Sequence, residues 1–441
     1  MTRRPTSNRR RRAAAVLAAA AVLSAVAALS GCVTAPAGGA QIVVARFGNA
    51  TADPVVVSVT GLRPGQDVVL TASATTLAGE WRSRALYAVP PTGTVDTASQ
   101  QPITAPYVRP DAAAMFWSMS GPSVSQAELE RAWAEGPVRI ALTAQQQGVR
   151  VATTEVQRSP LASQSVERDV SIADLTRDAP AGDAVPPATG PGLRVGTLFT
   201  PLPTLVHPRP AVLLIDGDDD AASGAFAARR IAAIGFPVLT LPAFGPEGQL
   251  PGSAALSVQT FDAARAWLSR RAGVDPDRIV VYGTGPAAPI ALWFAANEPG
   301  AVYGAIAASG PTAGLCASSS GAPTLLDDGR PVPCADPSRT IADTPILPLS
   351  RIPGPLLLAC GTADELLPSA CDWTSAGAAA RGPRAAGETL FADGSADELS
   401  APPMLPIGLR DLPPQTAQAT EDARVSFWSR VTALLEGAIG S

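Results

Sequence analysis

The 441-residue chain contains no lysine and a single histidine, His207. All 33 of its basic side chains are therefore arginines, and charged residues make up only 16% of the chain. With a formal net charge of −5, the sequence lacks the cluster of basic residues that a nucleic-acid-binding face requires. We therefore expect no nucleic acid among its partners. Hydrophobic residues, at 46%, are ample for a packed core, and the length has room for two or three domains.

A targeting segment is predicted at residues 1–31. Arginines at residues 9–12 form a charged region, and residues 13–28 form an apolar stretch of the length expected of a signal peptide. Leu-Ser-Gly-Cys follows at residues 29–32 and resembles the bacterial lipobox, with lipidation and cleavage at Cys32. We expect a protein anchored by lipid to the extracytoplasmic face of the cell membrane. The alternative is an uncleaved membrane anchor, for which the run is short and rich in alanine.

The remaining cysteines are even in number, which fits an exported chain. Five cysteines minus Cys32 leave four, and an oxidising compartment permits two disulfides with three possible pairings. Proximity in sequence favours Cys316 with Cys334 and Cys360 with Cys371. The alternative is four buried free thiols.

Two structural regions joined by a linker are predicted after the leader. Short β-prone runs separated by turns rich in glycine and proline indicate a small β-sandwich over residues 32–160, with a brief helix or loop at 125–135. Residues 161–192 are predicted to be a linker, because the stretch 179–192 is too rich in proline and glycine to bury a core.

From residue 193 to 441, strands alternate with helices, which is typical of an α/β domain with a mostly parallel sheet. Residues 211–215 are continuously apolar, as in strands that are buried on both faces. The expected strands are 195–199, 211–215, 236–241, 279–282, 304–307 and 356–360, and the expected helices are 222–234, 256–271 and 421–436.

The most informative segment is Gly-Thr-Gly-Pro-Ala at residues 283–287. It stands between a predicted strand, 279–282, and an apolar helix, 288–296. Strand, tight glycine turn and helix are the context of the nucleophile elbow in α/β-hydrolases. Here the central position, where serine or cysteine should stand, is Gly285.

The chain resembles the acyl-CoA thioester hydrolase/bile acid-CoA:amino acid N-acyltransferase family along most of its mature length. In the first region the resemblance rests on sequence at 53–55, 61–66, 81–85, 93–96 and 115–119, and in the second on 196–199, 274–279 and 361–369. It implies an immunoglobulin-like sandwich followed by an α/β-hydrolase domain. The family carries a serine or cysteine nucleophile, an aspartate and a histidine.

The resemblance places the nucleophile at Gly285, which has no side-chain heteroatom. A one-residue misalignment would make Thr284 the nucleophile, but a residue before the elbow centre should point away from the cleft. One oxyanion donor should be the backbone N–H of the next residue, and this is Pro286, which has none. The other should come from the loop containing Gly217.

That loop, residues 216–220, is rich in carboxylates where the family has a glycine-rich loop. If the carboxylates faced the cleft, they would repel a developing oxyanion. They could alternatively bind a cation such as Ca²⁺. A solvated turn is the simpler interpretation, and we predict no metal or cofactor.

Of the expected triad, only the acid is present. Asp364 follows the apolar strand 356–360, where the family's acid lies, although it could equally cap a helix or accept loop hydrogen bonds. The family's histidine falls at Ala396. His207 enters at the opposite end of the strand 211–215, about 20 Å from the carboxyl ends where catalytic groups gather.

These substitutions together predict a hydrolase scaffold without the machinery for acyl transfer. We expect a non-catalytic envelope lipoprotein that binds an acyl or other apolar ligand, or a protein partner. One alternative is a working ester or thioester hydrolase that uses unusual residues, such as Ser309. The other is a purely structural envelope protein.

Overall fold

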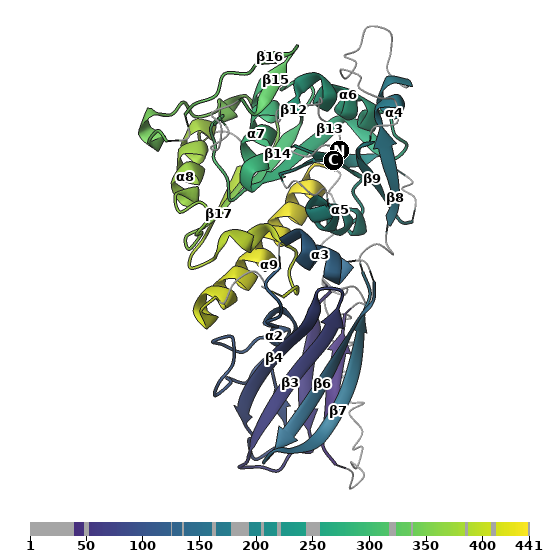
Figure 1. The fold of residues 1–441 in the computed structure, drawn as a ribbon, viewed down its shortest axis with the longest axis vertical. Helices are drawn as coiled ribbons and strands as arrows, with labels where there is room; N and C mark the ends of the chain where they lie inside the picture. Colours follow the sequence, from purple (N-terminus) through teal and green to yellow (C-terminus); the bar gives the residue numbers. More distant parts are fainter. Residues whose placement is uncertain are drawn as a thin grey trace, which may run out of the picture. The chain divides into compact units, whose positions relative to one another are not determined.

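The structure is a computed structural model (Figure 1). It describes residues 39–47, 53–124, 126–134, 136–160, 165–177, 194–203, 207–217, 222–243, 256–316, 323–336, 338–383, 387–406 and 412–439. The predicted leader and Cys32 lie outside these ranges. Among the helices of the described ranges, none combines the length and the apolar character needed to cross a bilayer.

Two antiparallel sheets form the N-terminal region, as the sequence predicts. Their strands alternate between buried and more exposed residues, because successive side chains of a strand point to opposite faces. One sheet has the order β1-β2-β5 and the other β4-β3-β6-β7. The strands are β1 (Gln41–Arg46), β2 (Val55–Thr60), β3 (Asp67–Thr76), β4 (Gly79–Ala88), β5 (Val95–Asp96), β6 (Val138–Gln146) and β7 (Val149–Arg158).

Two short helices lie between the strands of this region. The first is α2 (Ala114–Trp117), and the second is α3 (Gln126–Ala134), which occupies the segment predicted as a helix or loop. Helix α3 packs against α5 (Ala222–Ala233), the first long helix of the second region (Figure 1).

An eight-stranded sheet organises the second region, in the order β18-β17-β14-β13-β10-β11-β9-β8. The strands from β10 onward run parallel, whereas β9 is antiparallel to both β11 and β8. This is the sheet of an α/β-hydrolase fold, as predicted. Its strands are β8 (Ser165–Ser171), β9 (Arg194–Pro201), β10 (Arg209–Asp216), β11 (Val238–Pro242), β13 (Val274–Thr284), β14 (Gly304–Ala308), β17 (Leu356–Gly361) and β18 (Gly387–Ala392).

Helices cover both faces of this sheet. Alternate residues of β10 separate into two apolar clusters: Leu213 packs with α6 and α7, and Leu214 packs with α5 and α9. The covering helices, besides α5, are α4 (Ile172–Arg177), α6 (Val258–Ser269), α7 (Ala288–Asn297), α8 (Ala370–Arg381) and α9 (Pro414–Gly437). A small sheet of β12 (Leu256–Ser257), β15 (Leu325–Asp327) and β16 (Arg330–Pro331) lies outside the main one.

The predicted linker at 161–192 is wrong in its first half. Residues 165–171 form β8, the edge strand that pairs with β9, and residues 172–177 form α4. The prediction failed because β8 carries charged residues along an exposed edge, as edge strands often do. The proline- and glycine-rich stretch that motivated the linker lies outside the described residues.

Two further boundaries differ from the sequence-based expectation. Strand β18 was not among the expected strands; it becomes a strand by pairing in register with β17. The last helix begins at Pro414, seven residues before the expected start at 421. Proline suits the first helical turn, where its missing N–H leaves no bond unmade, and the polar residues that follow it concealed the helical pattern.

Candidate active site

The carboxyl ends of the parallel strands bring the predicted site residues to one edge of the sheet. Strand β13 ends at Thr284, and a short 3-10 turn, Gly285–Ala287, leads directly into α7. Gly285 has a φ of +52°, in the left-handed region that favours glycine. The strand, turn and helix expected at 283–296 are therefore present, with glycine at the strained centre of the turn.

Close backbone packing fixes this turn. A Cβ atom on Gly283 would lie 2.5 Å from the carbonyl oxygen of Ala287, and one on Gly310 would lie 2.3 Å from the carbonyl oxygen of Gly285. Real Cβ atoms do not approach so closely, so both positions require glycine. A Cβ on Gly285 itself would meet no atom of the described residues within 4 Å. Within the part of the chain that the structure describes, the turn is crowded from the side and open at its centre.

The two predicted oxyanion positions lie side by side. A Cβ on Gly217, just after β10, would be 3.1 Å from the backbone nitrogen of Ala287 and 3.4 Å from Cγ of Pro286. The loop after β10 therefore packs against the turn, as expected for this fold. Pro286 occupies the position whose backbone N–H would donate to the oxyanion in the family that the chain resembles, and proline has no N–H.

Asp216, the first carboxylate of the acidic loop, is buried at 4% exposure. Its Oδ2 atom accepts the backbone N–H of Gly224, 2.8 Å away, in the first turn of α5. A carboxylate at a helix N-terminus is stabilised by the unpaired N–H groups there. The other three aspartates of the loop lie outside the described residues. Within the described residues of the chain, no group of three or more histidine, cysteine or acidic side chains could hold a metal ion.

Asp364 lies in the loop after β17 and is buried at 5% exposure. Its Oδ1 atom accepts the backbone N–H of Leu367 at 2.8 Å, one of the two roles that the sequence left open for it. The predicted disulfide between Cys360 and Cys371 closes this loop, and the other predicted pair, Cys316 with Cys334, is also bonded. Both pairings are those favoured by proximity in sequence.

Ala396, at the predicted histidine position, is buried in the loop after β18. Its backbone N–H donates to Oγ1 of Thr420 on α9, at 3.0 Å. A Cβ on Gly361, the last residue of β17, would lie 2.5 Å from the carbonyl oxygen of Ala396. The loop is therefore packed against the strand that precedes Asp364, so the fold brings the acid and base positions to neighbouring strands.

Ser309, the candidate for an alternative nucleophile, lies beside Gly310 at the end of β14. It adopts a positive φ of 51° and is buried. Its hydroxyl donates to the backbone carbonyl of Asp397 at 3.1 Å, so it acts as a tie between two loops. His207 is exposed and precedes the amino end of β10, away from the turn at Gly285, as predicted.

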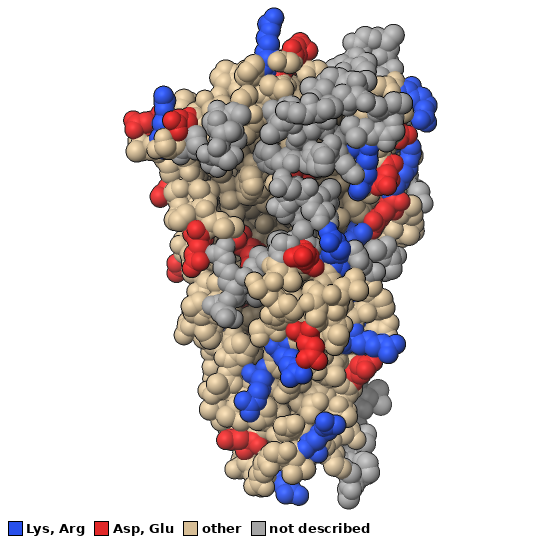
Figure 2. Space-filling model, in the orientation of Figure 1, with Lys and Arg blue, Asp and Glu red and all other residues tan. Residues whose placement is uncertain are grey.

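A shallow pocket lies beside α7, the helix that follows the turn. Its lining includes Pro289, Ile290 and Trp293 from the helix. Val332 and Cys334, at or near the Cys316–Cys334 disulfide, also contribute to it. On the face shown in Figure 2, basic and acidic side chains are interspersed and most of the surface is uncharged.

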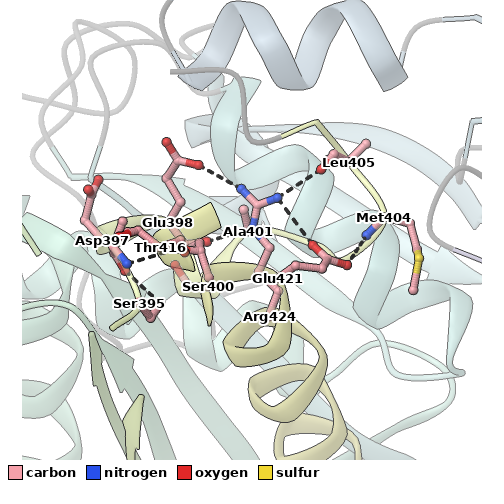
Figure 3. Close-up of polar contacts among 12 residues, drawn as sticks. Ser395, Asp397, Glu398, Ser400, Ala401, Met404, Leu405, Thr416, Glu421 and Arg424 are labelled. Carbon is pink, nitrogen blue, oxygen red and sulfur yellow. Dashed lines mark hydrogen bonds and ion pairs between the residues drawn. The ribbon is translucent and has the colours of Figure 1, made fainter. Parts of the chain in front are cut away.

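Sequence reasoning missed a buried ionic cluster next to the Ala396 loop. Arg424 of α9 is fully buried and binds Glu398 and Glu421, which are also buried (Figure 3). Glu421 and Arg424 are three residues apart on one helix, a spacing that brings side chains together. The contact of Glu398 with Arg424 could not be predicted from the sequence, because Glu398 lies in a loop 26 residues away and only the tertiary fold brings the two together.

One family model matches part of the N-terminal region. Residues 52–179 match the family model for the acyl-CoA thioester hydrolase/BAAT N-terminal region. The match covers nearly all of the antiparallel region and extends through β8 and α4. No curated protein matches the chain.

Several solved structures are similar to the chain at low sequence identity. A putative dienelactone hydrolase from Klebsiella pneumoniae is 16% identical with a TM-score of 0.41, over 62% of this chain and 98% of that one. A bacterial heroin esterase is 18% identical with a TM-score of 0.41, over 64% of this chain and 88% of that one. An esterase from Pyrobaculum calidifontis is 16% identical with a TM-score of 0.37, over 64% and 89%.

The packing at the turn predicts a contrast between two glycine substitutions. We expect Gly310→Ala to lower the free energy of unfolding by roughly 1–3 kcal/mol, because its methyl group would overlap the Gly285 carbonyl. Gly300→Ala is the matched control, since a Cβ there meets nothing within 4 Å among the described residues. Urea unfolding of both variants checks the prediction, and equal midpoints would show that the turn is not packed as described.

Proposed function

We propose that this chain is a catalytically inactive relative of acyl-CoA thioester hydrolases, anchored by lipid at the cell envelope, that binds an acyl or other apolar ligand. The observation that carries the proposal is Gly285. It stands at the open centre of a turn whose packing is otherwise that of a nucleophile elbow, and it has no reacting atom.

Two further positions support inactivity. Pro286 offers no N–H to a developing oxyanion, and Ala396 offers no base to the loop after β18. Losing one oxyanion donor costs about 10²–10³ in kcat, and losing a nucleophile costs about a millionfold in enzymes of this mechanism. Asp364 alone has no histidine to orient.

The site's surroundings favour an apolar ligand over a thioester of coenzyme A. The turn that holds Gly285 leads into α7, whose residues Ile290 and Trp293 line a shallow pocket. Coenzyme A thioesters are cytosolic, whereas a chain lipidated at Cys32 faces outward. A protein partner seated at the same place is the second candidate, since the space above Gly285 in the described residues suits either occupant.

Inactivity is tested by assay and by covalent labelling. We expect the purified protein to hydrolyse p-nitrophenyl esters and acyl thioesters no faster than the uncatalysed reaction. Asp364→Ala should change nothing, and a fluorophosphonate probe should label no side chain. The triple variant Gly285→Ser, Pro286→Ala, Ala396→His restores the missing groups and should gain labelling at residue 285. Turnover in the wild type that falls with Asp364→Ala would refute inactivity.

Ligand binding is tested at the same residue. A phenylalanine at residue 285 would project into the open space, so Gly285→Phe should abolish the thermal stabilisation that fatty acids or lipid extracts give the wild type. Gly285→Ala carries the same left-handed backbone penalty, about 1–2 kcal/mol, without the bulk, and should retain the stabilisation. If both variants respond like the wild type, the ligand does not bind above the turn.

Anchoring is tested at Cys32. We expect the full chain to partition into the detergent phase after export, and Cys32→Ala to lose lipid attachment and signal-peptide cleavage together. Metabolic labelling with a radioactive fatty acid gives the readout, and Cys360→Ala is the control cysteine. Lipid incorporation that survives Cys32→Ala would rule out the lipoprotein assignment.

A further inference from the structure

The two sheets of the N-terminal region differ in their outer faces. In β2 of the β1-β2-β5 sheet, Val55, Val57 and Val59 are buried, so the residues between them point outward. Residues that pair across antiparallel strands share a face. On the outer face of this sheet, Val43, Ala45 and Phe47 therefore lie opposite Ser58, Val56 and Pro54.

This outer face carries no charged side chain from β1 or β2. Arg46, the only charged residue of β1, pairs with the buried Val55 and so belongs to the other face, at the end of the strand. Strand β5 adds one carboxylate, Asp96, which accepts the N–H of Ala98 at 3.0 Å and the hydroxyl of Ser99 at 3.2 Å. Over the described strands of this sheet, charge is thus confined to one edge of the outer face.

The outer face of the β4-β3-β6-β7 sheet is charged. Arg82 and Glu80 of β4 pair at 2.9 Å, and each side chain is 66% exposed. Arg139 of β6 lies 4.0 Å from Glu155 of β7, and both are mostly exposed. Polar and charged residues are usual on the solvated side of an antiparallel sheet. The β1-β2-β5 sheet is therefore the one whose outer face departs from the pattern of a face in water.

Large apolar side chains are exposed on this uncharged face. Phe47 is 73% exposed and Val43 is 48% exposed. Strand β1 forms an edge of its sheet, where natural proteins usually place charged residues to prevent association. Exposed apolar side chains on an unprotected edge are typical of a surface that another surface covers.

The chain that precedes β1 indicates which surface this is. Nine residue steps separate Cys32, the predicted lipidation site, from Gln41, the first residue of β1. A fully extended chain spans at most about 3.6 Å per residue, so Gln41 lies within roughly 32 Å of Cys32 by any path. A lipid on Cys32 would therefore keep β1 close to the bilayer. No other strand of the described chain is tied to that position by so short a covalent link.

A bilayer surface suits the uncharged face better than the charged one. Phenylalanine and valine side chains gain free energy at the boundary between headgroups and acyl chains, whereas ionised side chains lose hydration there. Anionic headgroups would also repel Glu80 and Glu155. A second copy of the chain would cover an apolar face only at sufficient protein concentration, but an anchored molecule meets the bilayer at every concentration.

We infer that the outer face of the β1-β2-β5 sheet lies against the lipid bilayer, with Val43 and Phe47 inserted at the level of the headgroups. This inference rests on the lipid anchor of the proposed function, and it is independent of what binds near Gly285. The anchor holds the chain at the membrane, and the uncharged face decides which side of the N-terminal region meets the lipid.

Two matched spin-label positions test this contact. Ser58 lies on the uncharged face, and Ser73, which pairs with Arg82, lies on the charged face; both are half-buried. Ser58→Cys and Ser73→Cys each introduce one thiol by the same small change. The lipidated full chain, labelled with a nitroxide, is reconstituted in vesicles of phosphatidylethanolamine and phosphatidylglycerol. Collision rates are then measured with oxygen, which concentrates in lipid, and with a water-soluble nickel complex.

We expect the ratio of oxygen to nickel collisions to be several times higher at residue 58 than at residue 73. The unsubstituted chain is the control for the anchor. Its other four cysteines form two disulfides, so lipidation of Cys32 leaves no free thiol and the chain should take up no label.

Three results would overturn the inference, and they differ in what else they affect. Equal ratios at the two positions, with the unsubstituted chain unlabelled, would refute the membrane contact and leave the anchor standing. Low collision rates with both reagents at residue 58 would show that protein, such as a second copy of the chain, covers the face. Label uptake by the unsubstituted chain would show a free thiol at Cys32, and the anchor would then fail together with this inference.

Discussion

Close backbone contact at the carboxyl end of β13 is the constraint on which the site depends. Gly283 and Gly310 leave no room for a Cβ, and Gly217 brings the loop after β10 against Pro286. Three segments distant in sequence thus meet through main-chain atoms alone. Such contacts do not depend on which side chain stands at Gly285, so the geometry of the turn is compatible with the absence of a reacting group.

The same reasoning applies at the other two triad positions. Asp364 is held by the N–H of Leu367 inside a disulfide-closed loop, and Ala396 is held by Thr420. Neither position needs a catalytic partner to be ordered. Local bonds therefore secure the arrangement of both loops.

A buried ionic cluster lies close to Ala396, the position at which the family resemblance places a histidine. Arg424 and its two carboxylates contribute order at a high cost of desolvation, because each charge leaves water. Replacing them with apolar residues would avoid that cost. The cluster therefore orders the loop after β18 at a cost that apolar residues would not carry.

The sequence alone determined the features that short segments encode. Buried apolar runs predicted the central strands, cysteine spacing predicted both disulfides, and the residues at 285, 286 and 396 were identified within strand, turn and loop patterns that the structure contains. Only the tertiary structure decided the rest. Strands β8 and β18 exist through pairing with distant partners, and Glu398 reaches Arg424 across 26 residues of chain. Local pattern cannot reveal these contacts, since their energy comes from groups that folding alone brings together.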